Sequence, residues 1–100
     1  MLTREQAEEV ARSQIEEIGR GVRGGVALMP QSTIEKPYGW VFFFNSKRFV
    51  ETGDVFWALG GNSPILVEAE SGRITLLGTA TSVHDSLARF ELDSGFSRMP

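Results

Sequence analysis

The chain contains no cysteine and only one histidine, His84, in 100 residues. Without cysteine, neither a disulfide framework nor a thiol nucleophile can form, and a zinc site would lack enough ligands. We therefore expect no metal site and no cofactor. Long apolar runs are also absent from the N-terminal segment, where charged residues recur every few positions, so it resembles neither a signal peptide nor a membrane span. On these grounds we expect a soluble, cytoplasmic protein.

The chain has fewer basic than acidic residues: ten lysines and arginines against 13 aspartates and glutamates, which gives a net charge of −3. Contacts to nucleic-acid phosphates need a clustered basic surface, so this balance argues against a nucleic-acid partner. A hydrophobic content of 41% in 100 residues is enough for one core but not for two. The sequence therefore predicts a single domain over residues 1–100.

The first 18 residues predict an amphipathic helix. Thr3 and Gln6 have the spacing of a capping box, and Gly19 marks the end of the helix. Apolar residues recur at spacings of three and four and form one stripe, which comprises Ala7, Val10, Ala11, Ile15 and Ile18. A helix with one apolar stripe is expected to lie on a sheet.

Farther along, the apolar period changes to two, which predicts strands. The strand-like segments are residues 26–30, 39–46, 64–69 and 74–79. The turn sequence ESGR at residues 70–73 predicts that the last two strands form a hairpin.

The remaining segments predict turns and one more helix. Residues 51–54, ETGD, predict a turn, and residues 55–61 a short helical or irregular segment. Ser82, with Asp85 three residues later, predicts the start of a short final helix. The predicted fold class is therefore α+β, with an N-terminal helix packed on a four-stranded, mostly antiparallel sheet and a short C-terminal helix.

The central segment YGWVFFFNS, residues 38–46, is apolar on both faces of its predicted strand. One face, expected to lie under the first helix, carries Tyr38, Trp40, Phe42 and Phe44. The other face carries Val41 and Phe43, which Leu66 and Leu77 could join. Two interpretations of this second face remain open. Either residues 55–61 and the C-terminal helix cover it, or it is partly exposed and binds a partner.

Motifs that suggest chemistry do not fit their structural context. Gly19, Gly21 and Gly24 match the dinucleotide fingerprint, but here a helix enters the glycines and a strand leaves them, the reverse of the required order. Glu51 and Asp54 are typical of a solvated or capping pair in a turn. His84 lies too close in sequence to its neighbouring serines for a catalytic triad to form. The sequence therefore predicts a protein that is not an enzyme.

The middle of the chain offers candidate partner-binding residues instead. Trp57 is either a core residue or an interface anchor. Lys47 and Arg48 form a basic group beside Phe49 at the end of a predicted strand, where they are either a solvated strand end or part of an interface. The predicted partner-binding residues are Phe43, Lys47, Arg48, Glu51, Asp54 and Trp57. The two edges of a four-stranded sheet could also pair with a second copy of the chain or with a partner strand.

Several separated motifs resemble the bacterial immunity protein 35 family, also described as YrhB-like small proteins. They are the runs GWVFFFNSKRFVETGD and LGGNSPILVEAESGRITLLGTA, together with a compatible N-terminal helix. The family pattern falls on Gly39, Trp40, Phe42, Ser46, Phe49, Glu51, Thr52, Gly53, Asp54, Gly61, Asn62, Pro64, Gly72, Leu77, Gly78 and Thr79. This sequence departs from the pattern at Ser86, where an aromatic residue is usual.

The resemblance implies an immunity protein that binds and blocks a cognate protein toxin of a bacterial polymorphic toxin system. The small negative charge would suit a basic partner such as a nuclease toxin. The alternative is a chaperone-like protein that holds unfolded clients through an exposed apolar face, for which Phe43 is the main support.

Overall fold

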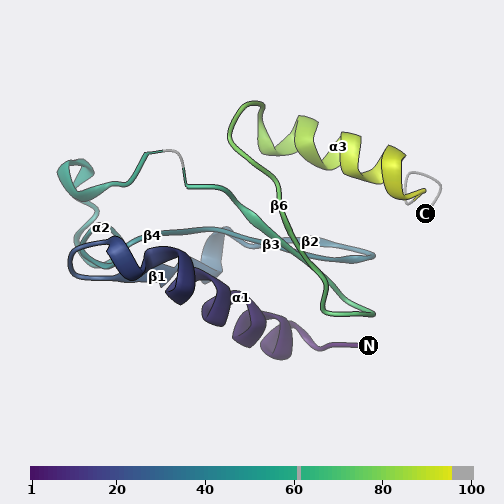
Figure 1. The fold of residues 1–100 in the computed structure, drawn as a ribbon, viewed down its shortest axis with the longest axis horizontal. Coiled ribbons are helices and arrows are strands. Elements are labelled where there is room, and N and C mark those ends of the chain that lie inside the picture. Colours follow the sequence, from purple (N-terminus) through teal and green to yellow (C-terminus); the bar gives the residue numbers. More distant parts are fainter. Residues whose placement is uncertain (61, 96–100) are drawn as a thin grey trace.

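The computed structural model describes residues 1–60 and 62–95 and places helices on both faces of a sheet (Figure 1). The helices are α1 (Arg4–Ile18), α2 (Lys47–Thr52) and α3 (Val83–Ser94), and the strands are β1 (Val26–Leu28), β2 (Ile34–Lys36), β3 (Gly39–Phe42), β4 (Phe44–Ser46), β5 (Ile65–Glu68) and β6 (Ile74–Leu76). Short 3-10 helices lie at Gly19–Gly21, Pro30–Ser32 and Val55–Trp57. The predicted α+β class is confirmed.

The described strands form two antiparallel sheets. The larger has four strands in the order β2-β3-β5-β6, and the smaller pairs β1 with β4. The single strand predicted for residues 39–46 is wrong, because the run divides at Phe43: β3 pairs with β2 and β5, whereas β4 pairs with β1. The short strand β2 lies in a segment for which no strand was predicted.

Helix α1 begins and packs as its sequence predicts. The Thr3 amide donates a 2.9 Å hydrogen bond to Gln6 Oε1, and the Gln6 amide donates to Thr3 Oγ1 at 3.2 Å, which completes the capping box. The core on this face of the sheet contains Ala7, Ala11 and Ile15 of α1 with Leu28, Trp40, Phe42, Phe44, Ile65, Val67 and Ala69. Two alanines on the stripe allow α1 to lie close to the strands.

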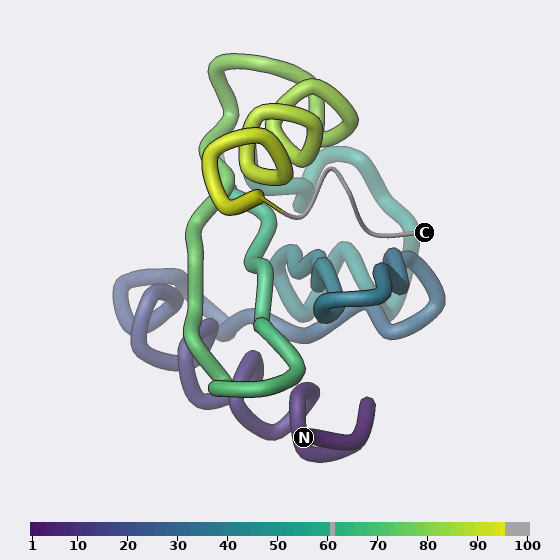
Figure 2. The backbone as a smooth tube through the Cα atoms, turned by 90° about the vertical axis from the view of Figure 1, so that its right-hand side faces the viewer, coloured from purple at the N-terminus to yellow at the C-terminus, as the bar shows by residue number. Residues whose placement is uncertain are grey.

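The second face of the sheet is covered by α3, as Figures 1 and 2 both show. Val41 and Leu66 are fully buried against Leu87 of α3. Partly buried side chains complete this second cluster: Ile34, Phe43, Leu77, Val83 and Phe90. Of the two interpretations of this face, coverage by the C-terminal helix is confirmed. The described residues 55–60 take no part in either core cluster.

Tyr38 is the exception to the predicted alternation. It was expected on the α1 face with Trp40, but it belongs to the cluster under α3. The reason is that Tyr38 lies in the turn between β2 and β3, before the regular strand begins, so the two-residue period does not extend to it. Trp40 lies in the α1-side core, as predicted, and its indole N–H donates to Glu35 Oε1 at 3.3 Å.

The predicted hairpin between β5 and β6 is confirmed. Gly72 in its turn has a φ of 72°, a left-handed conformation that glycine adopts without a steric penalty. Gly61 of the family pattern lies outside the described residues. Within the described parts of the chain, no helix combines the length and apolar character needed to cross a membrane.

Candidate functional site

Helix α2 carries most of the predicted partner-binding residues. Lys47 and Arg48 were expected at the end of a strand, and Glu51 in a turn, but all three lie on this helix. Ser46 explains why a helix forms here instead of a strand end and a turn. Its hydroxyl accepts a 3.1 Å hydrogen bond from the Phe49 amide and so caps the helix. Gly53 ends the helix with a φ of 73°.

Polar side chains of β4 hold the segment that follows α2. The Ser46 hydroxyl donates to the carbonyl oxygen of Trp57, and Asn45 Oδ1 accepts a 2.7 Å hydrogen bond from the Leu59 amide. Asn62 completes the attachment, because its side-chain amide donates to the carbonyl oxygen of Phe44. The position of Trp57 is therefore fixed by β4 and by the cap of α2.

The 3-10 helix Val55–Trp57 presents apolar side chains to solvent. Val55 and Phe56 are 81% and 80% exposed, and Trp57 is 39% exposed. The Phe56 and Trp57 rings meet edge to face with their centroids 5.1 Å apart, and Arg48 Cζ lies 4.4 Å from the Trp57 ring centroid. The contacts with the Arg48 guanidinium and with the edge of the neighbouring ring order Trp57 while leaving much of it accessible.

A second arginine reaches this area from the glycine-rich segment after α1. Antiparallel pairing of β1 with β4 brings residues 23–25 beside α2, where the Lys47 amide donates a 3.0 Å hydrogen bond to the Gly25 carbonyl. Arg23, Gly24, Arg48, Glu51 and Trp57 line a hollow of about 440 Å³. We call the surface formed by Arg23, Arg48, Glu51, Val55, Phe56 and Trp57 the Trp57 patch.

The charged groups around the Trp57 patch are available to a partner. Ion pairs within the described residues do not involve Arg23, Lys47 or Arg48. The same holds for Glu51 and for Asp54, whose carboxylate accepts a 3.0 Å hydrogen bond from the Phe56 amide. Basic and acidic groups thus lie close to an exposed aromatic pair, a composition that suits protein recognition.

The structure brings only some of the predicted site residues together. Arg48, Glu51 and Trp57 share the hollow, with Lys47 on the same helix, whereas Asp54 caps the 3-10 helix. Phe43 belongs with the side chains packed against the cluster under α3 and lines no part of this hollow. Arg23, Val55 and Phe56 share the patch but were not among the predicted partner-binding residues. The sequence signal for the last two was an apolar run, VFW, in a segment bounded by glycines.

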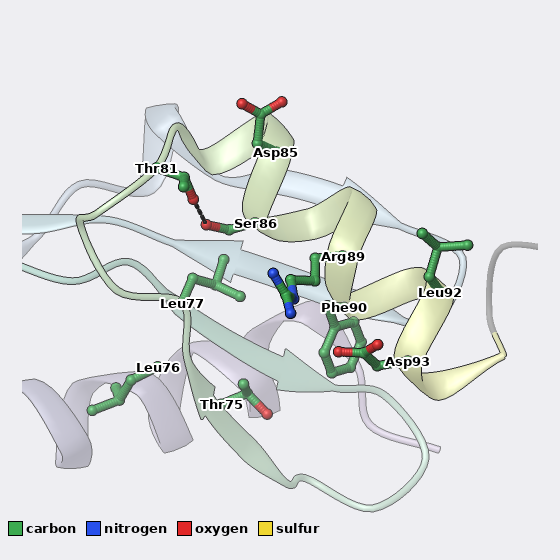
Figure 3. A pocket seen from close by; sticks show the side chains of 10 residues that line it. All are labelled: Thr75, Leu76, Leu77, Thr81, Asp85, Ser86, Arg89, Phe90, Leu92 and Asp93. Atoms are coloured by element: carbon green, nitrogen blue, oxygen red, sulfur yellow. Dashed lines mark hydrogen bonds between the residues drawn. The ribbon is translucent and has the colours of Figure 1, made fainter.

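A second hollow, of about 850 Å³, lies between β6 and α3 (Figure 3), and its lining includes Asp85, Arg89 and Asp93. Across residues 1–60 and 62–95, acidic and histidine side chains do not gather in a group that could hold a metal ion. His84 is exposed near the start of α3.

One titratable network joins α3 to the sheet. The Tyr38 hydroxyl donates a 2.7 Å hydrogen bond to Glu91 Oε2, and Lys36 Nζ lies 3.3 Å from the same oxygen. The hydrogen bond from Tyr38, followed by Lys36, lowers the pKa of Glu91 below its usual value. Burial and the nearby carboxylate raise the pKa of Tyr38. This network holds α3 in place and lies apart from the Trp57 patch.

Comparison with known proteins identifies the family of this chain. The family model described as Immunity protein 35 matches residues 5–93. A relative, the uncharacterized protein YrhB of Escherichia coli (strain K12), is 37% identical over 62 residues, which are 62% of this chain and 66% of that protein. The match thus spans just under two thirds of the relative's length. No solved structure matches the chain.

Proposed function

The chain belongs to the immunity protein 35 family, and from this membership we propose that it binds a cognate bacterial toxin domain and blocks its action. A protein of this kind needs a stable scaffold and a complementary surface, and it needs no catalytic group. We propose that it acts by stoichiometric binding, without turnover, in the cytoplasm of the cell that makes the toxin.

The Trp57 patch is the surface that we expect to bind the toxin. Tryptophan and arginine are enriched among the residues that dominate binding energy at protein interfaces, and the patch combines one tryptophan with two arginines. Phe56 is 80% exposed, so a partner that covers it would remove a large apolar area from water, with a gain of about 1.5–3 kcal/mol for full burial. The hydrogen bonds from β4 hold this segment in place before binding, which reduces the entropy lost on association.

The charges around the patch specify the partner surface. The net charge of −3 is accounted for by α1, which carries two arginines and five glutamates. By contrast, Arg23 and Arg48 line one hollow, and Lys47 precedes Arg48 on α2. The ion pairs among the described residues include none of these three basic groups. We therefore expect the toxin surface that meets the patch to carry carboxylates around an apolar pocket, even where the toxin as a whole is basic.

The test uses a candidate cognate toxin domain from the organism that carries this gene. Wild-type chain, Trp57→Ala and Arg48→Ala are each co-expressed with the active toxin in a sensitive strain, and binding to an inactivated toxin is measured by calorimetry. Leu92→Ala is the matched control, because Leu92 is 70% exposed and lies on α3. We expect wild type and Leu92→Ala to restore growth and to bind one toxin per chain. Trp57→Ala should bind about 30-fold more weakly, as for an interface residue worth about 2 kcal/mol.

Two outcomes separate the function from the surface. If wild type neither binds the toxin nor restores growth, the proposed function is wrong. If wild type protects and Trp57→Ala protects equally well with equal affinity, the function stands and the Trp57 patch is not the binding surface. The chaperone-like alternative would require suppression of aggregation of an unrelated heat-denatured enzyme. Its sequence support is weaker because Phe43 packs against the cluster under α3.

A further inference from the structure

Strand β6 lies at one end of the four-stranded sheet, and its outer edge is not paired with another strand of the described chain. Strand β6 is the last in the order β2-β3-β5-β6, so only one of its edges is paired. Figure 2 shows the strand, in green, with α1 and α3 on either side of the sheet. An open edge of this kind offers backbone hydrogen bonds to another strand.

The hydrogen-bond pattern identifies which groups of β6 face outward. The Glu68 amide donates to the Arg73 carbonyl at 2.9 Å, and the Leu77 amide donates to the Pro64 carbonyl at 3.0 Å. Hydrogen-bonded pairs alternate along an antiparallel ladder, so the backbone of Thr75 faces β5. The N–H and C=O groups of the two residues beside it, Ile74 and Leu76, therefore face away from the sheet. Nothing in the described chain forms a hydrogen bond with these outward groups.

Apolar side chains flank this edge on both faces of the sheet. On the α1 side, Leu76 is 50% exposed and shares a hollow of about 370 Å³ with Ile18. On the α3 side, Leu77, Phe90 and the largely exposed Leu92 line the 850 Å³ hollow (Figure 3). A strand added to β6 would therefore cover apolar groups on both sides as well as satisfy the backbone.

The two edges of the four-stranded sheet differ in how well their residues prevent pairing with another strand. Strand β2, at the opposite edge, carries the charged residues Glu35 and Lys36 and is followed by Pro37, and charge and proline both discourage edge pairing. Strand β6 has the sequence Ile-Thr-Leu, without charge, proline or glycine. The edge at β6 is thus the one left open for pairing.

We propose that β6 pairs antiparallel with β6 of a second copy of this chain, about a two-fold axis at Thr75. In this register Ile74 of each copy lies opposite Leu76 of the other, and about four backbone hydrogen bonds link the two strands. Thr75 lies opposite its own equivalent on the α3 face, a favourable cross-strand pair.

The strand complements itself, which favours a second copy over an unrelated strand. Apolar residues meet apolar residues on one face, threonine meets threonine on the other, and no charges are opposed within the strand. The dimer does not rest on the proposed function. The edge shares no residue with the Trp57 patch, so a dimer leaves that patch available on each copy.

The first test is the molar mass of the purified chain, measured by light scattering from about 10 µM to about 1 mM, a range that covers weak association. We expect the mass to rise from 11.0 kDa toward twice that value. Leu76→Lys should remain at 11.0 kDa, because the new charge would be buried opposite Ile74. Val50→Lys is the matched control, an exposed apolar residue on α2, and should associate as wild type does.

Amide hydrogen exchange of the wild-type chain decides the question even if Leu76→Lys does not fold. The amides of Ile74 and Leu76 should become slower to exchange as concentration rises, while that of Thr75 is slow throughout. A chain that stays monomeric over this range overturns the proposal, as does a dimer in which the Ile74 and Leu76 amides exchange at a rate independent of concentration. Protection of these amides only when the toxin domain is added would assign the edge to a toxin strand and would also overturn the dimer.

Discussion

The Tyr38 hydroxyl and the Glu91 carboxylate, 53 residues apart in sequence, are joined by a 2.7 Å hydrogen bond. This contact ties the last turns of α3 to the turn between β2 and β3. Beside it, the Tyr38 and Phe90 rings lie 5.6 Å apart, centroid to centroid. A polar contact and an aromatic contact thus hold α3 over the second face of the sheet.

We predict that Glu91 makes the stability of the fold depend on acid pH. Because Tyr38 and Lys36 hold its pKa below the ordinary value of 4.5, the charged carboxylate stabilises the folded chain fully above pH 4.5. This contribution is lost as pH falls from 4.5 through the folded-state pKa. Glu91→Gln can still accept the hydrogen bond but cannot ionise. Melting temperatures of the two proteins should therefore differ most at neutral pH and converge as pH is lowered.

Glu70→Gln is the control for this experiment, because Glu70 is exposed and takes part in none of the five ion pairs of the described chain. Its melting temperature should follow that of wild type at every pH. A constant difference between wild type and Glu91→Gln across the acid range would show that the charge of Glu91 does not stabilise the fold.

The ionisation of Tyr38 gives an independent prediction, since it is the only tyrosine in the chain. Burial, and then Glu91, raise its pKa above the ordinary value of 10.0. The stability that the neutral phenol provides is therefore complete below pH 10.0 and is lost as pH rises above it. The ultraviolet absorbance of tyrosinate should appear well above pH 10.0 in the folded protein and near pH 10.0 in denaturant. Equal titration in both conditions would contradict the burial of Tyr38.

The two neighbouring phenylalanines should differ in their effect on stability. Phe42 is completely buried beneath α1, so Phe42→Ala should lower the free energy of unfolding by about 3–5 kcal/mol in a denaturant titration. Phe43 is half-buried against the cluster under α3, so Phe43→Ala should cause a smaller but clear loss. Phe56→Ala, at an exposed position, is the control and should change stability little. If Phe43→Ala left stability unchanged but abolished toxin binding, Phe43 would belong to the binding interface, as the sequence predicted.

Local signals account for the parts of the fold that the sequence predicts correctly. The capping box at Thr3 and the cap at Ser82 specify where α1 and α3 begin, and the turn at Gly72 specifies the hairpin. These features depend on residues within one or two turns of each other. Helix α2 also has a cap, at Ser46, but there the cap follows an apolar run with strand-like alternation. The strand pattern therefore obscured the helix signal.

The Trp57 patch depends on contacts between distant segments, which the sequence pattern does not reveal. Arg23 reaches Arg48 only because β1 pairs with β4, and both of these strands have three residues. Trp57 is held by Ser46, 11 residues earlier, through a side-chain hydrogen bond to its carbonyl oxygen. Short strands and side-chain-to-backbone contacts carry little periodic signal, so only individual members of the patch were predicted.

The stacking of Arg48 on Trp57 should couple the two residues in toxin binding. A double-mutant cycle with Arg48→Ala and Trp57→Ala should give a coupling of about 0.5–1 kcal/mol, the range for an exposed cation and aromatic ring. Arg48→Lys should restore only part of the affinity, because lysine lacks the planar group that stacks on the ring. Strict additivity of the two single variants would indicate that Arg48 and Trp57 act independently.

Gly39 should tolerate no side chain, because β5 approaches it too closely. A Cβ atom at this position would lie 2.2 Å from the carbonyl oxygen of Val67, a backbone atom in the paired strand that cannot move without disturbing the ladder. Gly39→Ala should therefore lower the free energy of unfolding by about 1–3 kcal/mol or more. Gly21→Ala is the matched control, since its Cβ would meet nothing within 4 Å and its φ is not positive. Equal stability of the two variants would mean that β3 and β5 are not paired in this register.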